Sequence, residues 1–309
     1  MEEKSSFFKR TKKTLCRVYE THYKKLLLIP LLLIVLAFIQ IGVQYATTGD
    51  FVHKGISLKG GSTITLAQTL PFSSAELENR LQAAFPNREV QIRTLSTLGG
   101  EETLVIESNA QSKDEVAALL AFLQQESGLS ADDYSVEIVN PALGNSFFRQ
   151  ALGALGAAFL LMGIAVLLYF RVLIPSLAVI LAAFSDIVVT LAIFNLTGQP
   201  LSTAGIAAFL MLIGYSVDTD ILLSSRVLKR TDGSVMERIY GAIRTGMTMT
   251  GTTLAAVAIG LFVRNDTVHQ IMLIIFIGLF VDMIMTWIQN VGLLRLYLER
   301  KEKRKQVSS

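Results

Sequence analysis

Four aspartates fall inside long apolar stretches of the sequence, where carboxylates are rare: Asp186, Asp218, Asp220 and Asp282. At the centre of a bilayer, one such side chain costs about 2.5–3.5 kcal/mol on insertion scales. Carboxylates kept at that cost face a bundle interior or a wet cavity, and they often serve proton or ion movement. The four aspartates are therefore the first candidates for chemistry, and proton transfer is the chemistry that they suggest.

Asp218 and Asp220 lie in the stretch GYSVDTDILL, which starts at Gly214. Residues two apart on a helix point to nearly opposite sides, so the two carboxylates cannot face one cavity. We expect one of them to face a pathway or a partner helix and the other to find a structural partner or to lie at the interface. We favour Asp218 for the first role because Tyr215 and Leu222 share its face and Gly214 allows close packing beside it.

Arg244, just before the fifth apolar run, is the candidate counter-charge for one of these aspartates. Two interpretations stay open. The pair is a static ion pair that makes burial tolerable, or it is a protonation switch that breaks when the aspartate takes up a proton. Moving one charge across 100 mV is worth about 2.3 kcal/mol, which is enough to bias a two-state movement.

Other kinds of site have little support in the sequence. Cys16 is the one cysteine, which excludes an intramolecular disulfide and a cysteine-based metal cluster. Asp186 with Asp218 or Asp282 could form an aspartyl protease dyad. However, the residues before Asp218 and Asp282 do not match the Gly-x-Gly-Asp and Tyr-Asp patterns of such proteases. We therefore expect no enzyme activity, no metal, no cofactor and no nucleic-acid partner.

The elements that must position these residues are membrane helices. The chain has 309 residues, of which 51% are apolar and 17% are charged, and its mean hydropathy is +0.50. This composition is typical of a polytopic membrane protein. Six apolar runs are long enough to span a bilayer. They are Leu26–Val43, Ala151–Phe170, Leu173–Phe194, Leu201–Leu223, Met247–Val263 and Val268–Leu294.

The distribution of lysine and arginine predicts the orientation of these spans. With the N-terminus in the cytoplasm, the cytoplasmic segments hold 20 of the 28 basic residues. The short external loops hold only Arg264. Basic residues are retained on the cytoplasmic side, so we expect both termini to be cytoplasmic in a multi-pass protein of the cell membrane. The basic segment 224–246 then serves topology or offers a docking surface for another cytoplasmic component.

The segment between the first two spans has the composition of a soluble domain. It is predicted to fold as strand, helix, strand, strand, helix, strand, the order of a ferredoxin-like domain. The second helix opens with a capping box from Ser112 to Glu115. The fifth span differs from the others because it is rich in glycine and threonine, as in GMTMTGTTLAA. Such helices pack closely, so we expect it to lie inside the bundle rather than against lipid.

Several motifs resemble those of the archaeal-type SecF proteins, a branch of the SecD/SecF protein-export family that is related to the RND transporters. Gly60 and Gly61 match a double glycine after the first span, where Ser57 and Leu58 replace an acid and an aromatic residue. Ser185-Asp186 resembles a His-Asp pattern in the third span. The fourth span matches at Gly214, Tyr215, Ser216 and Arg226, and Arg244 matches an arginine before a threonine-rich helix.

This resemblance implies half of an RND-type bundle: six transmembrane helices with one ferredoxin-like external domain between helices 1 and 2. The expected parts are a basic tail (1–25), the first span (26–45), the external domain (46–146), five further spans (147–294) with a cytoplasmic loop (224–246), and a basic tail (295–309).

The function that the resemblance implies is a subunit of the SecDF accessory complex of the Sec translocon. It would assist preprotein export and use the proton gradient, with SecD, the Sec channel subunits, preproteins and the lipid bilayer as partners. Asp218 or Asp220 would then face SecD near Arg244. The alternative is half of an independent RND-like proton-coupled exporter of lipid or small molecules.

Overall fold

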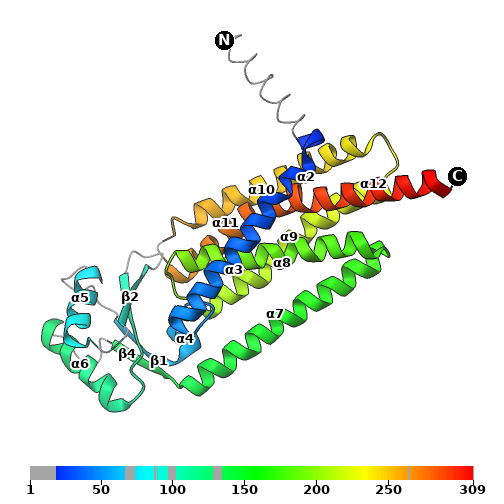
Figure 1. The fold of residues 1–309 in the computed structure, drawn as a ribbon. Coiled ribbons are helices and arrows are strands. Elements are labelled where there is room, and N and C mark those ends of the chain that lie inside the picture. Colours follow the sequence, from blue (N-terminus) through cyan, green and yellow to red (C-terminus); the bar gives the residue numbers. More distant parts are fainter. Residues whose placement is uncertain are drawn as a thin grey trace, which may run out of the picture.

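The computed structural model describes residues 19–66, 74–86, 88, 90–96, 102–127, 134–263 and 265–308. Long helices form a bundle, and a small sheet with two covering helices lies at one end of it (Figure 1). The C-terminus lies at the opposite end. The protein is therefore mostly helical, with a small sheet between its first and second long helices.

The long helices are α3 (Leu28–Thr48), α7 (Pro141–Phe170), α8 (Leu173–Leu196), α9 (Thr203–Lys229), α10 (Val235–Gly260), α11 (Asp266–Ile284) and α12 (Val291–Ser308), and a π-helix, η1 (Met285–Asn290), joins the last two. The short helices α2 (Tyr23–Leu26) and α4 (Ile56–Lys59) flank α3 along the chain. Within the described residues, five helical stretches are long and apolar enough to cross a membrane. These are Tyr23–Thr48, Pro141–Phe170, Leu173–Leu196, Thr203–Lys229 and Thr267–Arg304.

Helix α10 covers most of the run Met247–Val263 that the sequence predicts as a span and ends at Gly260, but it is not one of these five stretches. It packs against α9 and α11 and leaves part of its glycine- and threonine-rich face exposed. Thr248 and Thr252 donate hydrogen bonds to carbonyl oxygens of their own helix, at 2.8 Å each, so they need no partner helix. The expectation that this helix lies inside the bundle is therefore wrong for the isolated chain.

Two predicted boundaries also differ from the structure. Segment 224–246 is mostly helical rather than a loop, because α9 and α10 extend into it and only residues 230–234 connect them. Ser234 and Glu237 form a capping box that starts α10. Arg226 joins the two helices by donating to the Gly241 carbonyl oxygen at 2.6 Å and to Thr245 Oγ1 at 2.9 Å.

Helix α7 begins earlier than predicted, at Pro141 rather than after residue 146. Asn140 caps it by accepting a hydrogen bond from the backbone N–H of Ala142, at 2.9 Å. Proline is favoured at the first helical position, where its missing N–H costs nothing. The long helix therefore runs from the membrane region directly into the small domain.

The double glycine predicted from the sequence lies at this junction. Gly60 and Gly61 have φ angles of 86° and 149°, which side-chain-bearing residues rarely adopt. A Cβ on Gly60 would lie 2.6 Å from the backbone nitrogen of Pro141. Gly144, on the first turns of α7, faces the same segment. The glycines therefore let two backbones meet where the bundle joins the small domain.

The small domain has four antiparallel strands in the order β2-β3-β1-β4: β1 (Gly61–Leu66), β2 (Val90–Ser96), β3 (Glu102–Ser108) and β4 (Tyr134–Val139). Helices α5 (Ser74–Ala84) and α6 (Lys113–Ser127) supply the apolar side chains that pack on the sheet. This is the predicted strand and helix order. The largest fully buried side chains of its core are Ile64, Leu66, Leu77, Leu81, Ile106, Leu119 and Leu123.

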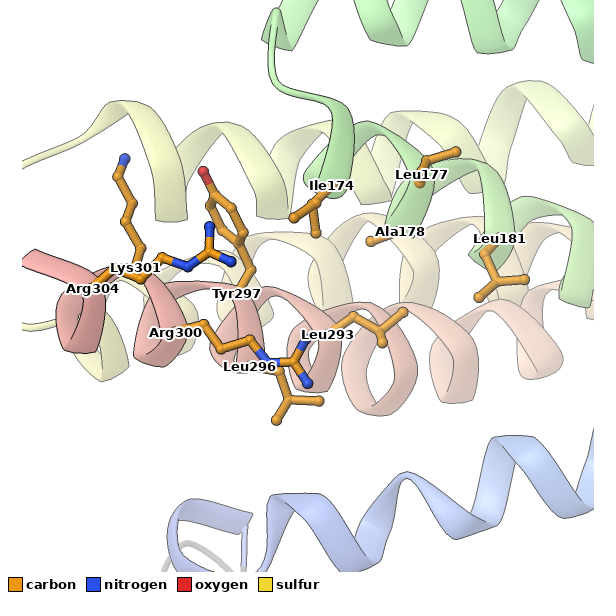
Figure 2. A pocket seen from close by; sticks show the side chains of 10 residues that line it. All are labelled: Ile174, Leu177, Ala178, Leu181, Leu293, Leu296, Tyr297, Arg300, Lys301 and Arg304. Atoms are coloured by element: carbon orange, nitrogen blue, oxygen red, sulfur yellow. The ribbon is translucent and has the colours of Figure 1, made fainter.

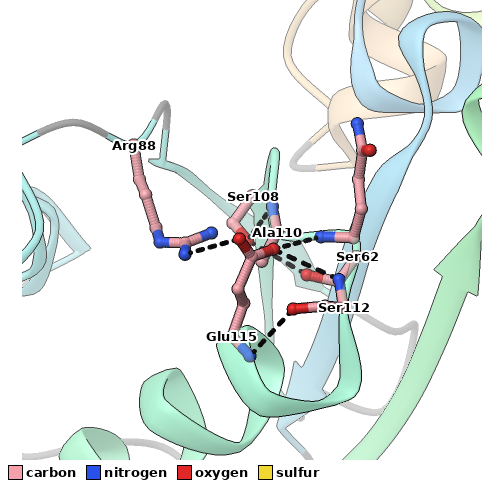
Figure 3. Close-up of polar contacts among 7 residues, drawn as sticks. Ser62, Arg88, Ser108, Ala110, Ser112 and Glu115 are labelled. Atoms are coloured by element: carbon pink, nitrogen blue, oxygen red, sulfur yellow. Dashed lines mark hydrogen bonds and ion pairs between the residues drawn. The ribbon is translucent and has the colours of Figure 1, made fainter.

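The capping box predicted at Ser112 is present and is larger than expected (Figure 3). Glu115 accepts hydrogen bonds from the backbone N–H groups of Gln111 and Ser112, at 2.9 and 3.2 Å. It also forms an ion pair with Arg88, at 3.1 Å. The Arg88 guanidinium and these two N–H groups lower the pKa of Glu115 from 4.5 to about 2.

This lowered pKa predicts an acid-labile element in the small domain. A carboxyl whose folded pKa is depressed stabilises the fold above its ordinary value of 4.5, and that contribution is lost as the pH falls towards about 2. In the full chain, the thermal midpoint of wild type is expected to drop more across this window than that of E115Q or R88Q. Equal drops in all three proteins would contradict this assignment.

Gly144 gives a test of the junction between bundle and small domain. A Cβ at this position would lie 2.9 Å from the Gly60 nitrogen and 3.1 Å from the Leu58 oxygen. Both are backbone atoms, so G144A is expected to cost about 1–3 kcal/mol and to lower the thermal midpoint. Gly153, on the same helix, has nothing within 4 Å of its Cβ position, so G153A is the matched control. It is expected to be neutral or to stabilise by up to about 1 kcal/mol. Equal midpoints for the two variants would show that the junction is not tightly packed.

Candidate functional site

Three of the four predicted aspartates lie in the interior of the bundle. Asp186 projects from α8, Asp220 from α9 and Asp282 from the last turn of α11, and they are 0%, 0% and 1% exposed. Asp186 interacts electrostatically with both of the others. Three helices that are separate in sequence therefore bring three carboxylates into one region, which we call the carboxylate cluster.

Hydroxyl and amide groups surround the carboxylate cluster. Ser216 Oγ donates a hydrogen bond to Asp186 Oδ2. Thr286 Oγ1 lies 3.0 Å from Asp220 Oδ1 and 3.0 Å from Asp282 Oδ1, so one hydroxyl links two carboxyl groups. Asn290 Nδ2 donates to Asp220 Oδ1 at 2.6 Å. These contacts replace part of the hydration that each carboxylate loses on burial.

The hydroxyl groups of Thr219 and Thr286 each contact more acceptor oxygens than they have hydrogens to donate. Thr286 has one hydroxyl hydrogen and can donate it to only one of the two carboxyl groups that it touches. Thr219 Oγ1 lies 3.0 and 3.2 Å from two backbone carbonyl oxygens and 3.3 Å from Asp282 Oδ2. When Thr219 donates its hydrogen to a backbone carbonyl, its contact to Asp282 is a hydrogen bond only if that carboxyl group carries a hydrogen and donates it; the same holds for one of the two contacts of Thr286. The geometry therefore suits a cluster that holds a proton.

Several oxygens of this region have no hydrogen-bond partner in the structure. They include Asp186 Oδ1, Asp220 Oδ2 and Asn290 Oδ1, which are all buried. No lysine, arginine or histidine among the described residues forms an ion pair with the three aspartates. No group of three His, Cys, Asp or Glu side chains in the described ranges could hold a metal ion. The cluster therefore has free acceptors, and no side chain among those that the structure describes places a cation against it.

Sequence reasoning missed Thr286, Gln289 and Asn290. They lie in η1, where the chain switches from α-helix to π-helix two residues after Asp282. Such π turns are rare and occur often at functional sites. The available signal was the polar content of the sequence TWIQN, inside a run that otherwise reads as a membrane span. Gln289 extends the network by donating to Ser185 Oγ at 3.2 Å.

The fourth aspartate, Asp218, lies outside the cluster on the exposed side of α9. The prediction that it and Asp220 point to opposite sides is confirmed. Tyr215 is 41% exposed beside it, and a Cβ on Gly214 would have nothing within 4 Å. Ser216, from the same motif, points inward to Asp186.

Arg244, the candidate counter-charge, is also exposed. Among the described residues it forms no ion pair with Asp218. The pair considered from the sequence is therefore not formed within this chain.

Thr286 gives a test of the cluster. T286V keeps the shape of the side chain and removes the hydroxyl that links Asp220 to Asp282. Two buried oxygens lose a partner, so a destabilisation of about 1–3 kcal/mol is expected, seen as a lower thermal midpoint. T190V is the matched control, because Thr190 is equally buried and its hydroxyl has no partner in the structure. This control is expected to be neutral or stabilising. A T286V midpoint at or above that of T190V would show that the hydroxyl does not support the cluster.

Known proteins resemble this chain in sequence and in fold. The family model described as "Protein export membrane protein SecD/SecF, C-terminal" matches residues 120–300. The chain is 37% identical over 292 residues to the protein-export membrane protein SecF of Pyrococcus furiosus, covering 94% of this chain and 96% of that protein. It is 36% identical over 283 residues to SecF of Methanothermobacter thermautotrophicus, covering 90% and 93%.

Among solved structures, SecDF of Thermus thermophilus, a translocon-associated membrane protein, matches with a TM-score of 0.70 and 22% identity. SecDF in its super-membrane-facing form matches with a TM-score of 0.64 and 21% identity. These structures show the same fold over 90% and 91% of this chain, which spans 38% and 39% of theirs. The resemblance found in the sequence motifs is confirmed, and the chain belongs to the SecD/SecF family of protein-export membrane proteins.

Proposed function

We propose that the chain is a subunit of a SecDF accessory complex of the Sec translocon and assists the export of preproteins across the cell membrane. The observation that carries this proposal is the match to curated SecF proteins over almost the full length of both sequences. The chain spans only 38% of the solved SecDF chain. A separate SecD subunit would supply the rest, and the Sec channel and the preprotein would be the further partners.

The proposed architecture has six membrane helices and one ferredoxin-like external domain. The sheet order β2-β3-β1-β4 with two helices supports the domain assignment. Helix α10 would be the remaining span, because its 26 residues reach about 39 Å, enough to cross a bilayer. The excess of basic residues in the tails and in segment 224–246 supports cytoplasmic termini and an external small domain.

The proposed energy source is the proton gradient, with the carboxylate cluster as the place where protons bind. The support is the shortage of hydroxyl hydrogens at Thr219 and Thr286, together with the absence of a cation in contact among the described residues. Uptake or loss of one proton would change which groups donate hydrogen bonds within the cluster. Asp186, Asp220 and Asp282 lie on separate helices, so a changed set of hydrogen bonds would change how α8, α9 and α11 pack.

Asp218 and Arg244 are proposed to face SecD. Each presents a charge on the exposed surface of a helix in a bundle that would lie in the membrane, and neither is neutralised by the other. A charge facing lipid is costly, whereas a charge facing a partner helix can find a polar group there. The open space at Gly214 and the exposed threonines of α10 would also allow another helix to approach closely.

An independent RND-like exporter of lipid or small molecules is the second candidate. It would need two copies of this half-bundle, and the exposed face of α9 would then meet a second copy of the same chain. Purification from native membranes in mild detergent separates the two candidates. A near-stoichiometric SecD subunit is expected, and a homo-oligomer without any Sec component would overturn the proposed function.

Isosteric variants of the aspartates test the two proposed roles. D220N and D282N cannot release a proton, and each is expected to slow preprotein export about ten-fold or more, because a positioned proton-transfer group contributes at least that much. D218N is expected to reduce the amount of SecD that co-purifies with the chain and to leave the carboxylate cluster unchanged. D114N, on the exposed start of α6, is the matched control. Export is measured in cells with this subunit replaced, with and without an uncoupler. Wild-type export in D220N and D282N would exclude the proton role while leaving the subunit assignment intact.

A further inference from the structure

A cavity of about 750 Å³ opens between the beginning of α8 and α12, away from the carboxylate cluster (Figure 2). Its walls come from one face of each helix, at spacings of three and four residues. The lining residues are Ile174, Leu177, Ala178, Leu181, Leu293, Leu296, Tyr297, Arg300, Lys301 and Arg304. We call this the α8–α12 groove.

One part of the α8–α12 groove is apolar. On α8, Ile174, Leu177 and Leu181 are 55%, 51% and 46% exposed, although they lie on the helix that carries Asp186. Leu293 and Leu296 continue the apolar surface on α12. Their exposure shows that no other described segment of the chain covers this face.

The other part of the groove is basic. Arg300, Lys301 and Arg304 follow the leucines on α12, within about 17 Å of Leu293 along the helix axis. Figure 2 shows the guanidinium groups of Arg300 and Arg304 reaching back along α12 towards the apolar part. No described residue forms an ion pair with any of the three cations. Within the described part of the chain, no acidic residue lines the groove.

We propose that the α8–α12 groove binds a membrane lipid with an anionic phosphate headgroup. Arg300 and Arg304 hold the phosphate oxygens, which guanidinium groups bind strongly, and Tyr297 lies beside them. The hydrocarbon chains lie against Ile174, Leu177 and Leu293. A lipid at the membrane boundary has this order of parts, with an anion at the surface and chains below it.

Charge and shape favour this occupant over a partner helix. Basic pockets between membrane helices bind anionic headgroups, and the described lining of this groove has three cations and no carboxylate. Its volume is in the range of ligand cavities, which is sufficient for a headgroup and the adjoining chain segments. The groove lies on the α8 side of α12, whereas the surface proposed for SecD lies on α9 and α10. The lipid site therefore does not depend on the proposed function.

The test uses the full chain, purified in mild detergent and freed of lipid. Dioleoyl phosphatidylglycerol and dioleoyl phosphatidylcholine are titrated while the thermal midpoint is recorded, and lipids bound after purification are counted by mass spectrometry. Wild type is expected to bind phosphatidylglycerol and to gain in midpoint, with little response to phosphatidylcholine. The double variant R300Q/R304Q is expected to lose affinity about ten-fold or more, because two charge-assisted contacts are removed.

Matched controls separate the site from general charge and general apolar surface. K303Q removes an exposed cation of the same helix that does not line the groove, and it is expected to bind as wild type does. L177W fills the groove and is expected to reduce lipid binding. L173W changes an exposed leucine outside the groove and is expected to bind lipid as wild type does.

Four outcomes would overturn the proposal. These are equal affinity for the two lipids in wild type, equal loss in K303Q and R300Q/R304Q, an equal gain in midpoint from inorganic phosphate alone, or loss of a partner subunit rather than of lipid in R300Q/R304Q. The first two would show that Arg300, Lys301 and Arg304 serve only to keep the C-terminal tail on the cytoplasmic side. The third would indicate a site for free anions, and the fourth a site for a partner helix.

Discussion

The structure depends on one constraint: three carboxyl groups lie in the interior of a helix bundle without a cation in contact among the described residues. Buried polar groups must be hydrogen-bonded, so hydroxyls and amides have to approach them from the neighbouring helices. This requirement accounts for polar residues at Ser216, Thr219 and Thr286, and it gives the π turn of η1 a role in placing them. Gly246 lets α10 approach η1 closely, since a Cβ there would lie 2.7 Å from Cη2 of Trp287, with another atom of that ring closer still.

The same helices connect the cluster to the small domain. Asp220 lies on α9, and the residue before its N-cap, Leu201, pairs with the segment after α3: its N–H donates to the His53 oxygen at 2.6 Å, and its oxygen accepts from Gly55 N–H at 2.8 Å. That segment continues through α4 and the double glycine into β1. Under the proposed function, this run of backbone contacts is where a shift of α9 would reach the external domain.

Much of this architecture could be predicted from the sequence because it follows from local patterns. Apolar runs gave the long helices, and the capping signal at Ser112 and the alternating strands gave the small domain. The two-residue spacing of Asp218 and Asp220 was enough to separate their faces. The π turn has no local pattern, so the roles of Thr286 and Asn290 emerged only from three-dimensional packing. Arg244 was matched to an aspartate by its charge and its place along the fifth span, and the structure leaves it exposed because α10 lies at the edge of the bundle.

Infrared difference spectroscopy of the reconstituted protein during a pH titration tests the central claim, that the carboxylate cluster holds an exchangeable proton. A protonated carboxyl group absorbs apart from a carboxylate, and its band shifts in heavy water. The account predicts such a band in wild type, one that titrates and that changes in D282N and D220N but not in D218N. A wild-type spectrum in which all three buried aspartates stay ionised, or a band unaffected by D282N and D220N, would contradict it.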